Sequence, residues 1–305
     1  MTMPRRDLLL GVLFSLAAII AWGVYFPLAK IVLQKLSPEV FLILRLGIGA
    51  AVLSALCVAA KLRVVIARRD LWIVLGAGCV GIIAHQLIQV NSLRLTSATN
   101  TGWILTLIPP VTGVLGWIFL RERVSLRQVM GLVIAVAGVL LLATKGHPGQ
   151  LSLVRHWGDV LALGSVLTWS LYTVMTKSRL TSYTPLLISA LHMTLGFLFF
   201  LGLGAGRLGG EIARLTGNDW LLIILIGVVP SGLAYYWWTA GLKRLSAMNT
   251  SMFLFLEAIV ASAAGHWLLA EEFTALMAGC AVVIIVGVYV AQSGPNPGRW
   301  LRNAG

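Results

Sequence analysis

The chain has 305 residues, of which 59% are hydrophobic and only 11% are charged. Because a soluble domain carries about 25% charged residues, this composition excludes an ordinary soluble fold and indicates a membrane protein. The formal net charge of +13 is compatible with nucleic-acid binding, so the placement of the basic residues has to be considered. Cys57, Cys79 and Cys280 lie in apolar runs without disulfide or metal-ligand spacing, and no metal or cofactor is predicted.

Ten apolar segments are long enough to cross a bilayer, whose core needs roughly 20 residues of helix. In chain order they cover residues 8–29, 39–60, 71–91, 99–119, 126–144, 158–176, 184–205, 220–240, 248–269 and 274–291. Ser37 before Pro38 and Thr184 before Pro185 predict sharp helix starts, each with a hydroxyl N-cap followed by proline at the first helical position. No polar stretch is long enough to fold as a separate domain.

The first half of the chain recurs in the second half. Counterparts lie 147 positions later for Trp22, Tyr25, Lys30 and Pro38, and 149 positions later for Asp70, Ser97, Ala98, Asn100, Thr101 and Glu122. A duplicated bundle of apolar helices is typical of a transporter whose site lies between the repeats. Five spans per repeat make the second copy enter the membrane from the opposite face. The sequence therefore predicts an all-α membrane protein with ten transmembrane helices in two inverted five-helix repeats, residues 1–146 and 147–305.

The basic residues are distributed unequally between the two predicted membrane faces. The face of the N-terminus carries Arg5, Arg6, Lys61, Arg63, Arg68, Arg69, Arg121, Arg123, Arg127, Lys177, Arg179, Lys243, Arg244, Arg299 and Arg302. The opposite face carries Lys30, Lys35, Arg94, Lys145, Arg155, Arg207 and Arg214. By the positive-inside rule, this excess places both termini in the cytoplasm. The positive charge is therefore expected to set topology, and no nucleic-acid partner is predicted.

Polar and aromatic side chains inside the spans predict a central substrate-binding cavity, because polar groups in a membrane are costly unless they face one another or water. They recur at three- and four-residue steps, which places them on single helix faces. The predicted lining consists of Trp22, Tyr25, His85, Gln89, Trp103, Trp169, Tyr172, Tyr235, Trp238, Asn249, Phe253 and Glu257. Pro109–Pro110 and Pro230 predict mid-span bends whose freed carbonyls would face this cavity. The alternative for each deep tryptophan is packing between helices, and for His85 an interhelical hydrogen bond.

Other residues are expected to have structural roles. Arg45 is expected to snorkel to the membrane surface and is left out of the site, whereas His192 is expected to make an interhelical hydrogen bond. Helix five has a row of small residues, Gly131, Ala135 and Gly138, and helix ten has a similar row at four-residue steps. Such rows allow close helix packing, so we interpret these two helices as scaffold that could also form the seam of a homodimer.

Several short stretches resemble a known family. Residues 21–26 (AWGVYF) with Lys30 resemble the opening helix of the drug/metabolite transporter superfamily, EamA type. Residues 107–109 (LIP) with Glu122 resemble the end of that family's first repeat, and residues 256–259 (LEAI) its equivalent in the second. Ala258 stands where the family usually has proline, which puts a backbone break there in question. Within the family the chain is most similar to the YddG-type exporters of aromatic and other neutral amino acids.

The resemblance implies ten helices, cytoplasmic termini, a bacterial inner-membrane location and a central cavity that opens alternately to each side. We therefore predict an exporter of small neutral metabolites, with an aromatic amino-acid preference suggested by the tryptophan-rich lining. One alternative is an exporter of lipophilic drugs or cations with Glu257 as counter-charge. An alternative of another class is an intramembrane enzyme that modifies lipids, which would need a nucleophile or metal cluster near one membrane face.

Overall fold

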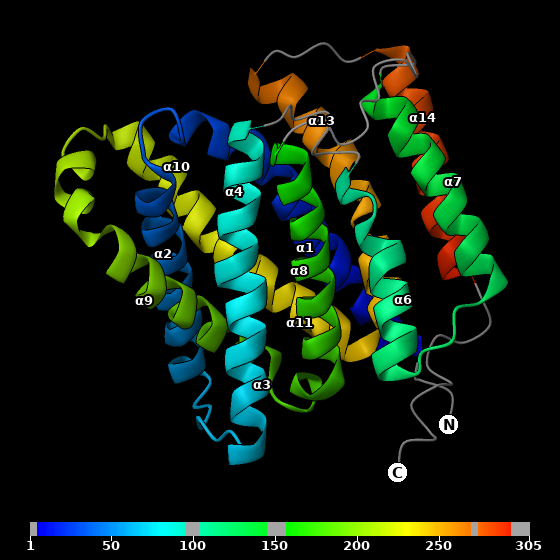
Figure 1. Ribbon diagram of the computed structural model, residues 1–305, viewed down its shortest axis with the longest axis horizontal. Helices are drawn as coiled ribbons and strands as arrows, with labels where there is room; N and C mark the ends of the chain where they lie inside the picture. The colour runs from blue at the N-terminus through cyan, green and yellow to red at the C-terminus, as the bar shows by residue number, and fades with distance from the viewer. Residues whose placement is uncertain (1–4, 96–103, 145–156, 270–273, 294–305) are drawn as a thin grey trace.

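The structure is a computed structural model that describes residues 5–95, 104–144, 157–269 and 274–293 (Figure 1). All regular secondary structure in these ranges is helical. The first half contains α1 Arg5–Val32, α2 Pro38–Ala59, α3 Arg68–Gly78, η1 Cys79–Ala84, α4 His85–Leu95, α6 Ile108–Leu120 and α7 Leu126–Ala143. The second contains α8 Trp157–Arg179, η3 Leu180–Ser182, α9 Pro185–Ile212, α10 Gly217–Ile226, η4 Gly227–Leu233, α11 Ala234–Arg244, α12 Ala247–Met252, α13 Phe255–Leu269 and α14 Ala275–Gln292.

The helices confirm the predicted all-helical membrane architecture. Nine stretches of the described residues are long and apolar enough to cross a membrane, and α6 is a shorter apolar helix where the fourth span was predicted. Several helices extend past the predicted boundaries; α9, for example, runs for 28 residues. A helix of that length measures about 42 Å and exceeds the roughly 30 Å of a hydrocarbon core, so its polar end continues beyond the apolar stretch.

The helix starts follow the local sequence signals. Ser37 caps α2 by accepting a hydrogen bond from the Val40 amide, and Pro38 occupies the first turn, which confirms the predicted start. Thr184 has the extended backbone of an N-cap before Pro185, but its side chain makes no capping hydrogen bond. The proline alone is thus sufficient to define where α9 begins, since its ring fixes a helical φ angle.

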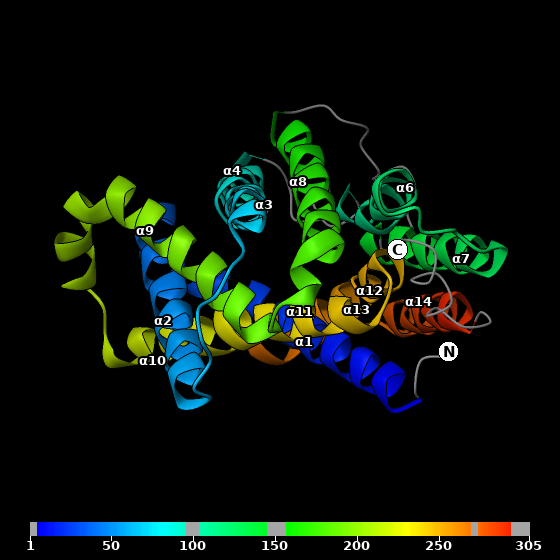
Figure 2. The same cartoon turned by 90° about the horizontal axis from the view of Figure 1, so that it is seen from below.

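Equivalent helices of the two repeats pack against each other, α2 against α9 and α7 against α14. In Figure 2, α2, α9 and α10 lie at one side of the molecule and α6, α7 and α14 at the other, with α1, α8 and α11 between them. A Cβ added at Gly131 of α7 would lie 2.4 Å from the Gly287 carbonyl of α14. The small residues predicted as scaffold therefore form an intramolecular seam, and a homodimer remains a prediction.

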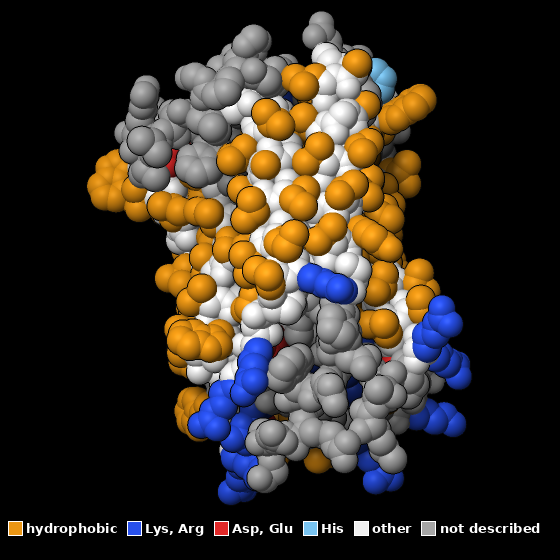
Figure 3. Space-filling view, turned by 90° about the vertical axis from the view of Figure 1, so that its right-hand side faces the viewer, with side chains coloured by type: hydrophobic (Ala, Val, Ile, Leu, Met, Phe, Trp, Pro, Cys, Tyr) orange, Lys and Arg blue, Asp and Glu red, His pale blue; other side chains and the backbone are white. Residues whose placement is uncertain are grey.

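The surface has the two zones expected of a membrane protein. Figure 3 shows a broad band of hydrophobic side chains on one face, with Lys and Arg side chains gathered at the lower end, where both termini lie in Figure 1. The side chains of Trp72 and Trp157, which begin their spans, are 79% and 78% exposed. An apolar band of this extent fits a surface covered by lipid, and tryptophan favours the membrane interface.

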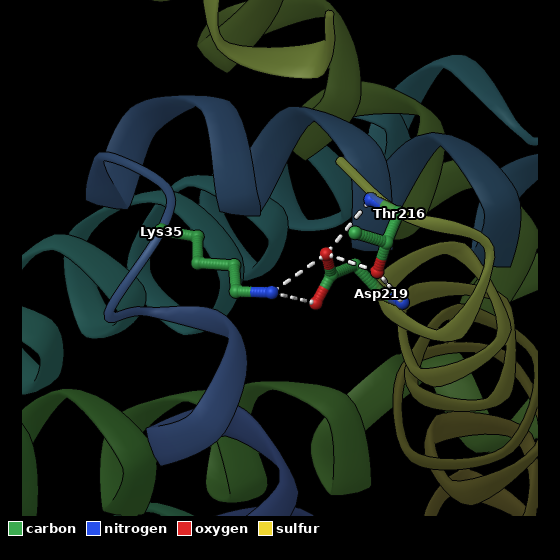
Figure 4. Close-up of polar contacts among 3 residues, drawn as sticks. All are labelled: Lys35, Thr216 and Asp219. Carbon is green, nitrogen blue, oxygen red and sulfur yellow. Dashed lines mark hydrogen bonds and ion pairs between the residues drawn. The ribbon is translucent and has the colours of Figure 1, made fainter. Parts of the chain in front are cut away.

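Two equivalent aspartates join the repeats at opposite ends of the molecule. Asp219, near the start of α10, accepts hydrogen bonds from Lys35 of the α1–α2 connection at 2.7 and 2.8 Å (Figure 4). Asp219 also forms a capping box with Thr216. Asp70, near the start of α3, accepts a hydrogen bond at 2.6 Å from the Tyr183 hydroxyl, which follows α8. Each aspartate thus holds the connection that follows the first helix of the other repeat.

Candidate functional site

Six rings from both repeats pack together inside the bundle. They belong to Trp22 of α1, His85 of α4, Trp169 and Tyr172 of α8, and Tyr235 and Trp238 of α11, and we call them the aromatic cluster. The Trp22 ring lies 5.2 Å from that of Trp169, 5.4 Å from Tyr235 and 5.5 Å from Trp238. These are ordinary distances for tilted and edge-to-face ring pairs. The structure therefore brings together six of the predicted lining residues, which pack directly on one another.

The aromatic cluster contains buried polar atoms without a protein partner. The indole nitrogens of Trp169 and Trp238 make no hydrogen bond to any described residue, and neither does the side-chain oxygen of Gln86. The Trp22 indole, by contrast, donates to the Pro230 carbonyl at 2.9 Å. Since buried polar groups are nearly always paired, two unpaired donors in the cluster, with one unpaired acceptor on Gln86 beside Tyr235, indicate a place where a polar ligand or water binds.

His85 and His192 connect neighbouring helices. His85 Nδ1 lies 3.3 Å from the Ser165 carbonyl of α8, and its ring lies 4.9 Å from that of Trp169. His85 thus combines an interhelical contact with a place in the aromatic cluster. His192 Nε2 lies 3.1 Å from the Val74 carbonyl of α3, which confirms the interhelical contact expected for it.

Two π-helical segments interrupt equivalent helices of the repeats. The segment η1 separates α3 from α4, and η4 separates α10 from α11, at positions related by the offset of 149 that also relates Asp70 to Asp219. Pro230 lies inside η4, so the predicted distortion of this span is confirmed. The segment η1 contains no proline and was not predicted. π-helical turns are frequent at functional sites, so their duplication beside the aromatic cluster makes this region the candidate site.

The third span brings one unpredicted residue, Gln86, to the aromatic cluster. The sequence placed His85, Gln89 and Ser92 on one face. In the structure Gln86, which was not predicted, donates to the Tyr235 hydroxyl at 2.8 Å. Ser92 instead donates to the Gly158 carbonyl of α8 at 2.9 Å. His85 and Ser92 thus both face α8, as their spacing predicts, whereas Gln86 faces Tyr235 of α11.

The ninth span is broken without a proline. Helices α12 and α13 are separated at Phe253 and Leu254, where backbone bonds reach three residues back, as from the Glu257 amide to the Leu254 carbonyl at 3.1 Å. The alanine at position 258 therefore does not prevent a break in the helix. The break lies four residues earlier, at Leu254. Phe253 is buried, and Glu257 is partly buried in the first turn of α13. In the fourth span, α6 begins at Ile108 directly after a turn, as the two following prolines predicted.

Arg45 does not snorkel, contrary to the prediction. Its side chain is 2% exposed and turns inward from α2. Nε donates to the Ser231 hydroxyl of η4 at 2.9 Å, and Nη1 donates to the Tyr25 hydroxyl of α1. Tyr25 thereby lies beside Arg45 and Phe41, whose ring stacks on it at 6.4 Å, and does not belong to the aromatic cluster. The side chain faces inward because Tyr25 and Ser231 offer two acceptors and a ring face there.

Besides Tyr25, the predicted lining residues Asn249 and Gln89 are not in the cluster. Asn249 lies near the start of α12, where its side-chain oxygen accepts a hydrogen bond at 2.7 Å from Gln128 of α7. Its carbonyl accepts another at 2.8 Å from Gln292 of α14. These contacts join helices, so we leave Asn249 out of the candidate site. Trp103 lies outside the described residues, and Gln89 is only partly buried on α4.

Comparison with known proteins agrees with the duplication and the helical fold. The model of the EamA-like transporter family matches twice, at residues 9–144 and 156–292. An uncharacterized transporter of Archaeoglobus fulgidus is 27% identical over 273 residues, which is 88% of this chain and 94% of that protein. A probable terminal-alkyne amino-acid exporter of Streptantibioticus cattleyicolor is 27% identical over 63% of each chain. One crystal structure superposes with a TM-score of 0.78 at 20% identity over 92% of this chain and 96% of that one, and so shares the fold.

Proposed function

Because the chain belongs to the EamA-like transporter family, we propose that it is a secondary transporter of the bacterial inner membrane that exports small neutral metabolites, amino acids with aromatic side chains among them. The similarity to a probable amino-acid exporter supports the substrate class. The multi-pass helical architecture supports the membrane location. Family membership favours transport over the lipid-modifying enzyme considered from the sequence.

The observation that carries the proposal is the aromatic cluster. It contains three buried tryptophans contributed by three helices from both repeats, and two of their indole N–H groups have no described partner. Flat aromatic or apolar side chains gain stacking energy in such surroundings, and the free indole donors suit a polar substrate group. Because the rings are packed together here, substrate entry requires that α1, α8 and α11 separate.

Alternating access is the mechanism that we propose for this separation. Transporters with inverted repeats move one bundle against the other around a central site. The aspartates Asp70 and Asp219 hold opposite ends of the molecule by contacts between repeats, and such contacts can be exchanged as one end opens and the other closes. In this mechanism the broken helices and π-helical segments supply the bending points, since their backbone bonds are already irregular.

The inverted five-plus-five topology can be tested with reporter fusions. A reporter placed after Gly305 is expected to be cytoplasmic, and one placed at residue 150 periplasmic, because the basic residues gather on the face of the N-terminus. Alkaline phosphatase and green fluorescent protein give opposite signals on the two sides. Reporters on the same side would contradict an odd number of spans in each repeat.

Flux from proteoliposomes tests the function itself. Purified protein is reconstituted with a panel of labelled amino acids inside the vesicles, with and without a pH gradient. We expect saturable efflux that is fastest for aromatic and other neutral amino acids. The alternative, an exporter of lipophilic cations with Glu257 as counter-charge, predicts that amphipathic cations move and also inhibit. Amino-acid efflux that amphipathic cations do not inhibit would support amino-acid export over cation export.

A further inference from the structure

Arg45 places a positive charge inside the membrane-spanning bundle. It lies seven residues after Pro38, about 10 Å along α2, and is almost fully buried. Its guanidinium carbon lies 4.4 Å from the centre of the Tyr25 ring, and its hydrogen bonds go to the hydroxyls of Tyr25 and Ser231. Every one of these contacts is therefore with a neutral group.

No carboxylate of the described residues balances the charge of Arg45 by an ion pair. An arginine keeps its proton in proteins, and a charge held away from water is costly unless an opposite charge accompanies it. A neutral residue at this position would avoid that cost, so the charge indicates an anion that arrives from outside the chain.

The guanidinium also lies next to the aromatic cluster. The Ser231 hydroxyl that accepts from Arg45 follows Pro230, whose carbonyl accepts from the Trp22 indole. His85 and Tyr235 of the cluster are both within Coulomb range of Arg45. The remaining terminal nitrogen, Nη2, donates to no residue that the structure describes. Arg45 thus holds an unused donor beside the rings proposed to bind the substrate.

We infer that Arg45 binds a carboxylate of the transported metabolite, with Tyr25 and Ser231 orienting the guanidinium. This inference rests on the proposed function and narrows its substrate class to zwitterions and anions that carry a carboxylate beside an apolar or aromatic group. The planar fork of a guanidinium matches the two oxygens of a carboxylate, so binding would pair two charges and use Nη2. The same charge repels cations, so amphipathic cations are poor substrates.

Binding to the purified protein tests the inference separately from flux. Quenching of tryptophan fluorescence in detergent is measured with L-phenylalanine, with 3-phenylpropionate, which keeps the carboxylate and lacks the amine, and with 2-phenylethylamine, which keeps the amine and lacks the carboxylate. We expect both carboxylates to bind and the amine to bind at least tenfold more weakly, because only the carboxylates pair with Arg45. Equal binding of the amine and 3-phenylpropionate would overturn the assignment.

Substitutions test whether Arg45 itself is responsible for carboxylate binding. Arg45→Gln should weaken 3-phenylpropionate binding by at least about 30-fold, because it removes one member of a charged, hydrogen-bonded pair. Arg45→Lys keeps the charge without the fork and should lose about tenfold. Ser231→Ala removes the acceptor that positions Arg45 and should lose about fivefold. Arg207→Gln is the matched control, because Arg207 is an exposed arginine paired with Glu39 at 3.5 Å, and it should bind as the wild type does.

The outcomes separate the two proposals. If Arg45→Gln folds and binds 3-phenylpropionate as tightly as the wild type, Arg45 is not the carboxylate site. If that variant does not fold, the three wild-type titrations together with Arg45→Lys and Ser231→Ala give the answer. Carboxylate binding without flux would refute the transport proposal and leave the Arg45 assignment in place. Flux that prefers the amine would refute the Arg45 assignment alone.

Discussion

Two buried cations of this protein, Lys177 near one end and Arg45 further inside, are held in different ways. Lys177, in the last turn of α8, donates to the Leu242 carbonyl at 2.7 Å and lies within Coulomb range of Glu122. Among the described residues, Arg45 makes its polar contacts with hydroxyls and aromatic rings. A buried cation with an acidic partner stabilises a packed interface, whereas one without such a partner points to a ligand. The presence or absence of a nearby acidic group therefore distinguishes structural cations from ligand-binding ones better than burial does.

The region around Lys177 connects α8, α11 and α12 of the second repeat to Glu122 of the first repeat. The Glu122 carboxylate follows α6 and accepts hydrogen bonds at 3.0 and 3.1 Å from the Ala247 amide at the start of α12. Burial raises the pKa of Glu122, although the Ala247 amide and the charge of Lys177 lower it in part. The repeat counterpart Lys30 is exposed on α1. Equivalent lysines are thus buried at the end that carries the termini and exposed at the other end, which makes the two ends structurally unequal.

The largest effect that we expect is on stability, from Lys177→Met. Removing the Lys177 ammonium leaves the Leu242 carbonyl without its donor and takes a positive charge away from the buried Glu122 region, which costs about 3 kcal/mol. Thermal denaturation in detergent, followed by size-exclusion chromatography, should show a clear drop in midpoint for Lys177→Met and none for Lys30→Met, its exposed counterpart. Arg45→Met should lose less than Lys177→Met, because the described partners of Arg45 are neutral hydroxyls. A larger loss for Arg45→Met would mean that Arg45 is the structural cation.

The pH dependence of Lys177→Met has a predictable sign. The folded-state pKa of Glu122 is raised by burial, and loss of the Lys177 charge raises it further. A group with a raised pKa favours the folded state below its unfolded value, and this contribution is lost as the pH rises through the folded value. The deficit of Lys177→Met should therefore shrink as the pH is lowered from about 8 to about 5. Adding Glu122→Gln should remove this pH dependence.

The next effect compares two tryptophans of the aromatic cluster. Trp22 and Trp169 are repeat counterparts, but the indole N–H of Trp22 is bonded to the Pro230 carbonyl and that of Trp169 has no described partner. Trp22→Phe should therefore lower the denaturation midpoint by the equivalent of about 1 kcal/mol. Trp169→Phe should leave the midpoint near the wild type and weaken substrate binding. Equal loss of midpoint in both variants would mean that the free donor of Trp169 is not kept for a ligand.

The sequence revealed the composition of this cluster because duplication marks its members. Trp22 and Trp169 recur at a fixed offset, and the structure places their rings 5.2 Å apart. The existence of the helices and the starts marked by proline were also readable, since apolar length and proline caps depend on nearby residues alone, whereas several helix ends were placed too early. The sequence could not show which helix each polar residue of α4 would meet. Gln86 was missed because its partner, the Tyr235 hydroxyl, belongs to α11.

The direction of Arg45 was equally hidden. An arginine near a helix end can reach the surface or turn inward, and the choice depends on Tyr25 and Ser231, which belong to other helices. Asn249 was wrongly expected to face the cavity. It was aligned with Phe253 and Glu257 on one helix face, but its side chain accepts a hydrogen bond from Gln128 of a neighbouring helix. One available signal was missed: Arg45 is the one basic residue that the predicted topology placed within a span and outside both loop groups.

A smaller effect is expected at Glu257, and it concerns substrate choice. This carboxylate is partly buried on α13, and Tyr235 lies within Coulomb range of both Glu257 and Arg45. An amino acid bound at Arg45 could direct its ammonium group towards Glu257. Glu257→Gln should then weaken L-phenylalanine binding about fivefold and leave 3-phenylpropionate unchanged. Equal weakening of both ligands would instead assign Glu257 a structural role.

Glu257→Gln also tests proton coupling, since glutamine cannot titrate. If Glu257 carries the coupled proton, the variant should lose the dependence of flux on a pH gradient. If the variant keeps both the rate and the pH dependence of the wild type, the carboxylate neither couples protons nor binds the ammonium group. The measurement uses the same proteoliposomes as the substrate panel, with phenylalanine inside.

The smallest effects are expected at the two aspartate contacts that join the repeats at opposite ends. Lys35 donates to both oxygens of Asp219 at 2.7 and 2.8 Å, whereas Arg179 lies 3.7 Å from Asp70 and is 58% exposed. Exposed ion pairs contribute little and are screened by salt. Lys35→Met should therefore change the flux rate modestly and Arg179→Met hardly at all, because the Tyr183 hydroxyl still holds Asp70. Both differences should shrink as NaCl is raised from about 0.05 to about 0.5 M. A loss of flux in Lys35→Met that does not depend on salt would mean that Lys35 acts through packing. The contacts of Asp219 and Asp70 would then not play equivalent roles in the transport cycle.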